Sequence, residues 1–194
     1  MFEYNGRTAL IVVDIQNDFA DPAGSLSVAG GSDVIPVANA EVEAALAAGA
    51  LTVYTQDWHP EETPHFKDFG GVWPVHCVAG TWGAEFAPGL EVNGEVIHKG
   101  ANGEDGYSAF TMRDPRTAET ISTPLHGLLQ ARGIDSVVVL GLATDYCVKA
   151  TALDALTLGY SVTVLRDGIR AVDLEPGDGD AALAEIAEAG GAIL

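Results

Sequence analysis

The sequence predicts an α/β fold built on a parallel β-sheet, because short apolar runs alternate with helical patterns along the chain. The runs show no alternation of apolar and polar residues, which is typical of strands that are covered on both faces. Six runs have this character: Ala9–Val13, Leu51–Tyr54, Val96–Ile97, Val137–Leu140, Val162–Leu165 and Ala192–Leu194.

Four segments between these runs carry apolar residues at the spacing of an amphipathic helix. The apolar positions are Val34, Ala38, Val42 and Ala45, then Leu125, Leu128 and Leu129, then Val148, Ala152 and Ala155, and finally Leu183, Ile186 and Ala187. Thr123 and Pro124 supply an N-cap and a first-turn proline for the second helix. The helices are expected to end at glycines, namely Gly49, Gly133, Gly159 and Gly190.

The composition is that of one globular domain covering residues 1–194. At 194 residues and 47% hydrophobic content, the chain is large enough for a continuous core. Its 28 acidic and 9 basic side chains give a formal charge of -19, which repels nucleic acid phosphates and anionic membranes. We therefore expect a small-molecule partner, no nucleic acid and no membrane, in a monomer or homo-oligomer.

The sequence lacks the signals of export and membrane insertion. No window reaches the roughly 18 apolar residues of a membrane span, and the start of the chain does not resemble a signal peptide. Cys77 and Cys147 are too few for a disulfide framework. We expect a cytoplasmic protein with two free thiols. The last predicted strand ends abruptly at Leu194, and truncation of a longer chain is one explanation for this end.

Reactive side chains follow the predicted strands. In an open parallel sheet, ligands gather beyond the carboxyl ends of the strands. Those positions are held by Asp14, Asp57, Lys99 and the segment Gly141–Cys147. Packing alone does not select two acids, a lysine and a cysteine at one rim, so the sequence predicts a catalytic site there.

Cys147 is the candidate nucleophile. It is expected in the first turn of a helix, where unpaired N–H groups and the helix dipole favour a thiolate. Asp14 can take the thiol proton, Lys99 can stabilise negative charge, and Cys147 can attack an electrophilic carbon. The alternative for each residue alone is structural, with an Asp14–Lys99 ion pair and a cysteine that packs as a small hydrophobe.

The segment from about 55 to 95 replaces a helix with a long loop rich in Pro, Gly, Trp and His, and such loops are often functional. Asp57 and His59 face the same side of an extended segment, and His76 would complete a metal-binding face. This set suits Zn(II), Fe(II), Mn(II) or Co(II). His65 is a candidate fourth ligand, and its alternative is a surface group or a hydrogen-bonding partner. We expect one divalent ion, zinc or iron before manganese, and no organic cofactor.

Other conspicuous residues have structural interpretations. His98 is expected within a strand and His126 on a helix, and neither is assigned chemistry. Cys77 follows His76, and packing is favoured over redox activity. Three aromatic residues are candidates for the core or a pocket: Phe19, Trp73 and Tyr107.

The motifs together resemble the nicotinamidase/pyrazinamidase group of the isochorismatase-like cysteine hydrolases, along essentially the whole chain. A single Asp-x-His would be a weak signal, but the combination is specific. The matching stretches are Asp14–Phe19, Asp57–Pro60, Trp73–Thr81, His98–Gly100, Tyr107–Ser108 and Gly141–Val148.

The resemblance implies a three-layer α/β/α sandwich around a six-stranded, mainly parallel sheet. It also implies a catalytic triad of Asp14, Lys99 and Cys147. The implied metal ligands are Asp57, His59 and His76, while His65 stands where only some members carry a ligand.

The resemblance further implies an aromatic slot. A pyridine ring would lie between Phe19 and Trp73, with its nitrogen on the metal and its carboxamide facing Cys147. Tyr107 matches another pocket residue. A cis peptide before Ala143 would direct the N–H groups of Ala143 and Cys147 at the developing oxyanion.

The expected reaction is hydrolysis of nicotinamide to nicotinate and ammonia, a step of NAD salvage, with pyrazinamide as a second substrate. One alternative is a related enzyme with the same triad that acts on a carbamoyl or ureido compound. A non-haem iron oxygenase would use two histidines and a carboxylate, but it leaves Cys147 and Lys99 unexplained. A catalytically silent metal-binding relative is the third alternative.

Overall fold

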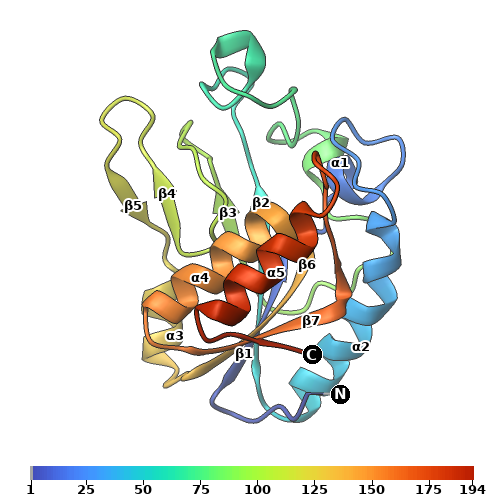
Figure 1. Ribbon diagram of the computed structural model, residues 1–194, viewed down its shortest axis with the longest axis vertical. Coiled ribbons are helices and arrows are strands. Elements are labelled where there is room, and N and C mark those ends of the chain that lie inside the picture. The colour runs from blue at the N-terminus through green and yellow to red at the C-terminus, as the bar shows by residue number, and fades with distance from the viewer. Residues whose placement is uncertain (1) are drawn as a thin grey trace.

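The computed structural model describes residues 2–194 and contains a six-stranded sheet as its central layer (Figure 1). Every neighbouring pair of strands in it is parallel. The strands, in spatial order, are β3 (Glu95–Lys99), β2 (Leu51–Asp57), β1 (Thr8–Val13), β6 (Ser136–Leu142), β7 (Ser161–Arg170) and β8 (Ala192–Ile193). All six predicted runs are therefore confirmed as strands.

Helices cover both faces of the sheet. One side carries α1 (Asn17–Ala20) and α2 (Val34–Ala47), and the other carries α3 (Leu125–Ala131), α4 (Lys149–Thr157) and α5 (Asp178–Glu188). Alternate β1 residues divide between the two layers, with Ile11 in the core under α3, α4 and α5 and Val12 in the core under α2. The predicted three-layer sandwich is confirmed. No helix among residues 2–194 is both long and apolar enough to span a bilayer.

The predicted glycines at the helix ends are confirmed, whereas the N-cap of α3 is Pro124 and not Thr123. The Thr123 hydroxyl accepts the Leu125 N–H at 3.2 Å, directly before α3. The helices α2, α3, α4 and α5 each end two residues before a glycine of positive φ. These glycines are Gly49, Gly133, Gly159 and Gly190.

Several short elements escape prediction. A hairpin of β4 (Thr111–Arg113) and β5 (Thr120–Ser122) stands apart from the main sheet (Figure 1). Strands of three residues are too short to show a period in the sequence. A π-helical turn, η4 (Thr144–Val148), precedes α4, and three 3₁₀ turns occur at η1 (Gly31–Asp33), η2 (Lys67–Phe69) and η3 (Trp82–Ala84).

The connection between β2 and β3 spans 58–94 and matches the long loop expected from the sequence. Short parallel bridges join His59 to Val78 and Phe66 to Trp73 within it. These bridges fold the loop back on itself, so that its histidines lie over the carboxyl end of the sheet.

Candidate active site

The four reactive residues meet at one rim of the sheet. Asp14 directly follows β1 with a left-handed φ of 47°, while Asp57 and Lys99 are the last residues of β2 and β3 and are paired in register. Both strands are longer than predicted, and each ends in a buried polar residue, Asp57 in β2 and Lys99 in β3. Cys147 reaches the same rim from η4.

A lysine ammonium joins these residues. The Lys99 Nζ lies 2.6 Å from Asp14 Oδ2, 2.9 Å from Asp57 Oδ1 and 3.4 Å from Cys147 Sγ. The Thr55 hydroxyl donates to the other Asp14 oxygen at 2.6 Å. All five residues are buried. The Oδ2 atom of Asp14 is therefore held toward Lys99 and Cys147.

Charge in this buried group is distributed unevenly. Burial alone would lower the pKa of Lys99, but the carboxylates of Asp14 and Asp57 raise it well above its usual value, so the ammonium persists. Burial raises the pKa of Asp14 despite the opposing charge of Lys99. A raised pKa makes Asp14 a stronger base than an exposed carboxylate.

The expectation that the helix start favours a Cys147 thiolate is wrong. Burial raises the pKa of Cys147 well above its usual value, and the nearby Asp14 carboxylate raises it as well. The positive charge of Lys99 lowers the pKa, but it offsets these two effects only in part. The largest cause of the raised pKa is desolvation of the thiolate by burial. The resting group is a thiol, which requires a base before it can attack.

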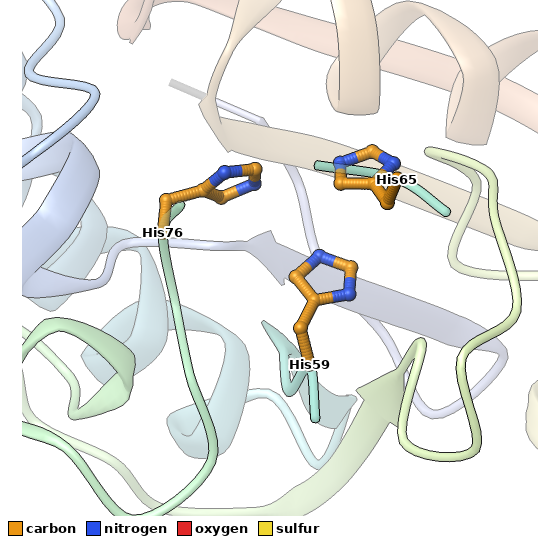
Figure 2. Close-up of side chains that lie close together, drawn as sticks. All are labelled: His59, His65 and His76. Carbon is orange, nitrogen blue, oxygen red and sulfur yellow. The ribbon is translucent and has the colours of Figure 1, made fainter. Parts of the chain in front are cut away.

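Three histidines of the β2–β3 loop gather beside this group. Figure 2 shows the rings of His59, His65 and His76 arranged around one space, and a ring nitrogen of each lies within 4.8 Å of the others. The Asp57 Oδ2 is 3.9 Å from His59 Nε2 and 4.0 Å from His76 Nε2. His65 is buried, so its alternative as a surface group is wrong.

Hydrogen bonds orient two of these rings. The His76 Nδ1 lies 2.7 Å from the Pro74 carbonyl oxygen, and the His65 Nδ1 lies 2.6 Å from Asp105 Oδ1. Acceptors at Nδ1 leave Nε2 available as a metal ligand, the arrangement common in metal sites. Both nitrogens of His59 are buried without a hydrogen-bond partner among residues 2–194.

The residues present fit a divalent cation. Burial lowers the pKa of His59 to about 4 and also lowers that of His76, so both rings are neutral, as metal ligands must be. Burial would raise the pKa of Asp57, but Lys99 and His59 lower it by more than burial raises it, so Asp57 is ionised. With His59 and His76 neutral, the carboxylates of Asp14 and Asp57 and the ammonium of Lys99 leave a buried negative charge that a cation would offset.

An aromatic cavity opens next to the nucleophile. It encloses about 370 Å³, counting its open mouth. The Trp73 indole N–H donates to the Tyr107 hydroxyl at 2.9 Å across one wall, and the bond between Leu142 and Ala143 is cis. The four predicted pocket residues all line this cavity, together with the nucleophile and three predicted ligands: Phe19, Trp73, Tyr107, Ala143, Cys147, Asp57, His65 and His76.

Other residues of the site were not predicted from the sequence. Tyr146 lines the cavity and packs edge-on against Trp73 at 4.9 Å, and its position next to Cys147 was the available signal. The Gln16 amide accepts from the Asp57 N–H and donates to the Asp57 carbonyl, each at 2.8 Å. Other wall residues carried no local signal: Leu26, Val28, Leu142 and Val172.

The residues expected to be structural lie outside the histidine cluster. His98 stacks on Trp58 with ring centroids 4.5 Å apart, and the His126 ring bonds to the Tyr160 hydroxyl. Cys77 is fully buried in the core under α2, which confirms its packing role.

Comparisons with known proteins agree with this geometry. The isochorismatase domain family matches residues 8–194. The nicotinamidase of Escherichia coli (strain K12) is 39% identical, over 95% of this chain and 93% of its own length. The solved pyrazinamidase of Pyrococcus horikoshii in complex with zinc is 40% identical, with a TM-score of 0.86 over 97% of this chain and 98% of its own.

A second solved structure carries a small molecule. PnC1 from L. infantum, in complex with nicotinate, is 38% identical and covers all of this chain and 95% of its own, with a TM-score of 0.88. The zinc-bound relative and the buried cluster of His59, His65 and His76 together suggest a metal ion. Family and fold thus agree along nearly the full length. The chain belongs to the isochorismatase family of hydrolases, in its nicotinamidase and pyrazinamidase group.

Proposed function

We propose that this protein hydrolyses nicotinamide to nicotinate and ammonia through a thioester on Cys147. The observation that carries the proposal is that Cys147, paired with Lys99 and Asp14, borders the same aromatic cavity as His65 and His76 of the histidine cluster. Pyrazinamide has the same carboxamide and one more ring nitrogen, so it is expected to react as well.

Acylation begins with the buried thiol. Asp14 takes the proton from Cys147, and the sulfur bonds to the carboxamide carbon while the carbonyl electrons move onto oxygen. The tetrahedral species collapses, the C–N bond breaks, and Asp14 returns the proton to the departing nitrogen as ammonia. The Lys99 ammonium, 3.4 Å from the sulfur, stabilises the negative charge during proton transfer.

Deacylation repeats the sequence with water. Asp14 removes a proton from the water, whose oxygen bonds to the thioester carbon. The C–S bond then breaks, and Asp14 returns the proton to sulfur. The carboxylic acid formed loses its proton to solvent, which leaves nicotinate and the original thiol as products.

The developing oxyanion requires donors. The Ala143 N–H, at the wall of the cavity, donates no backbone hydrogen bond within residues 2–194 and is available for this role. We assign the same role to the Cys147 N–H. A divalent ion held by Asp57, His59, His76 and His65 would supply a Lewis acid that binds one end of the substrate.

Phe19 and Trp73 would hold the flat ring between them. Both lie at the cavity surface and are mostly buried. An aromatic ring fixed beside Cys147 turns an encounter in solution into an oriented attack.

The test measures ammonia release from nicotinamide by purified protein of known metal content. Wild-type protein should release ammonia, and Cys147→Ala should lower kcat by at least about 1000-fold while it still folds and binds metal. Chelator treatment should lower release in the wild type. Cys77→Ala serves as the matched thiol control, because Cys77 only packs in the core.

Activity in Cys147→Ala would rule out the covalent mechanism. A metal-loaded wild type that releases no ammonia from nicotinamide would reject this substrate. A panel of carbamoyl and ureido amides would then identify the related alternative.

A further inference from the structure

A carboxylate outside the β2–β3 loop holds one of the three histidines. Asp105 lies after β3, and its Oδ1 is 2.6 Å from His65 Nδ1. The side chain of His65 is only 4% exposed, while that of Asp105 is 44% exposed. The bond therefore joins a buried ring to a carboxylate that reaches in from the surface.

Asp105 is itself fixed in place. Its backbone forms an antiparallel bridge with Arg113 of β4, with the Asp105 N–H donating to the Arg113 carbonyl at 2.8 Å. The Gly106 N–H donates to the same Asp105 Oδ1 at 2.9 Å. A Cβ on Gly106, whose φ is 134°, would lie 3.2 Å from Met112 Cα, so the tight turn favours glycine. The carboxylate is thus anchored to the β4–β5 hairpin.

The three histidines differ in what holds them. His76 bonds to a neutral carbonyl of its own segment, and His59 has no hydrogen-bond partner among residues 2–194. Within the described residues, only His65 of the three has a carboxylate at hydrogen-bond distance, because Asp57 lies 3.9 Å from His59 and 4.0 Å from His76. A carboxylate at Nδ1 fixes the tautomer with the proton on that nitrogen and makes Nε2 a better electron donor.

We propose that Asp105 is a positioning residue of the metal centre, which fixes His65 as a fourth ligand in this chain. The inference rests on the proposed function, because it requires a metal ion at the histidine cluster. The three histidine ligands come from the β2–β3 loop, whereas the residue that orients His65 comes from a separate segment, the turn between β3 and β4.

The experiment measures zinc dissociation constants by chelator competition, without substrate. Asp105→Asn keeps an oxygen that can accept the His65 N–H but removes the charge, and it should weaken zinc binding by about 10- to 100-fold. Glu104→Gln is the matched control, because Glu104 bonds to Asn102 and not to a histidine, and it should bind zinc as the wild type does. Asp105→Glu restores the charge and should recover part of the affinity.

A double-mutant cycle tests whether Asp105 acts through His65. In a His65→Ala background, Asp105→Asn should have no further effect on zinc affinity. Cobalt-substituted protein supplies a second readout that does not depend on zinc affinity. Asp105→Asn and His65→Ala should both change the visible cobalt spectrum, and Glu104→Gln should not.

Three results would overturn the inference. One is wild-type zinc affinity in Asp105→Asn, and another is an equal loss from Asp105→Asn with and without His65. The third is a wild-type protein that binds no zinc, cobalt or iron, which would reject the proposed metal centre itself. Thermal unfolding of the metal-free variants separates a loss of affinity from a loss of fold.

Discussion

At the scale of single residues, one ammonium group connects the two halves of the site. Lys99 contacts Asp14 and Cys147 on one side and Asp57 on the other, and Asp57 in turn lies about 4 Å from two histidines. Asp57 therefore belongs to the nucleophile group and the histidine cluster together. Removal of Lys99 would leave buried carboxylates without a counter-ion, which is costly in a dry site.

The stability of the metal-free protein should fall as the solution is acidified. Burial lowers the pKa of His59 from 6.5 to about 4, so the unfolded chain binds a proton that the folded chain does not in this range. The unfolded state then binds more protons, and the free energy of unfolding decreases as pH falls from about 6.5 toward 4. We expect a loss of roughly 2 kcal/mol from this group between pH 7.5 and 5.

Urea unfolding of metal-free protein at the two pH values measures this loss. The same measurement on His59→Asn isolates the contribution of His59 to the pH dependence of stability, because the carboxylates that titrate in the same range remain in both proteins. An identical pH dependence in the two proteins would contradict the assignment.

At the scale of elements, the register of two strands and one turn builds the junction. Asp57 and Lys99 are opposite one another in the β2–β3 pair, which brings carboxylate and ammonium together without any loop. Gly100 follows Lys99 with a φ of 75°, and a Cβ there would lie 2.6 Å from His59 Nδ1. The turn after β3 thus leaves the space that the His59 ring occupies.

Gly100→Ala should weaken metal binding by roughly 10-fold or more, because the added methyl group displaces His59. Gly103→Ala is the matched control. Gly103 also has a positive φ, 85°, but a Cβ there would meet nothing closer than 3.9 Å. Both variants carry backbone strain of about 1 kcal/mol, so both should melt earlier than the wild type.

Metal affinity distinguishes the two variants. Chelator competition should show a loss in Gly100→Ala alone. Equal affinities would mean that His59 can move without consequence for the site.

The elements also show where prediction from sequence ends. The four helix-ending glycines and the six strands follow from local periodicity and turn chemistry, so they were predicted within a few residues. The β4–β5 hairpin was not, because its strands have three residues each. The boundary of β2 was placed too early, since Gln56 and Asp57 are polar yet buried by contacts with distant segments.

At the scale of the whole molecule, the charge of -19 dominates the electrostatic field. The chain has nine basic residues, and Lys99 is buried in the site. The proposed substrate is neutral, but the proposed product is an anion. The field therefore opposes product binding and favours product release.

Salt should screen this repulsion. Raising ionic strength from about 0.01 M to about 0.15 M shortens the screening length from about 30 Å to about 8 Å. The inhibition constant of nicotinate should then fall by roughly 2- to 5-fold, while the KM of nicotinamide changes little. Inhibition kinetics at several salt concentrations measure the inhibition constant of nicotinate and the KM of nicotinamide. An inhibition constant that rises with salt would contradict this explanation.

The sequence by itself determined the layers, the direction of the strands and the rim at which Asp14, Asp57, Lys99 and Cys147 meet. Strand and helix periods are local, and parallel strands necessarily bring their carboxyl ends to one edge. Only the tertiary structure decided the burial of His65, its bond to Asp105, the cavity walls and the raised pKa of Cys147. These features depend on contacts between segments far apart in the chain and on the exclusion of water, which no local pattern of residues records.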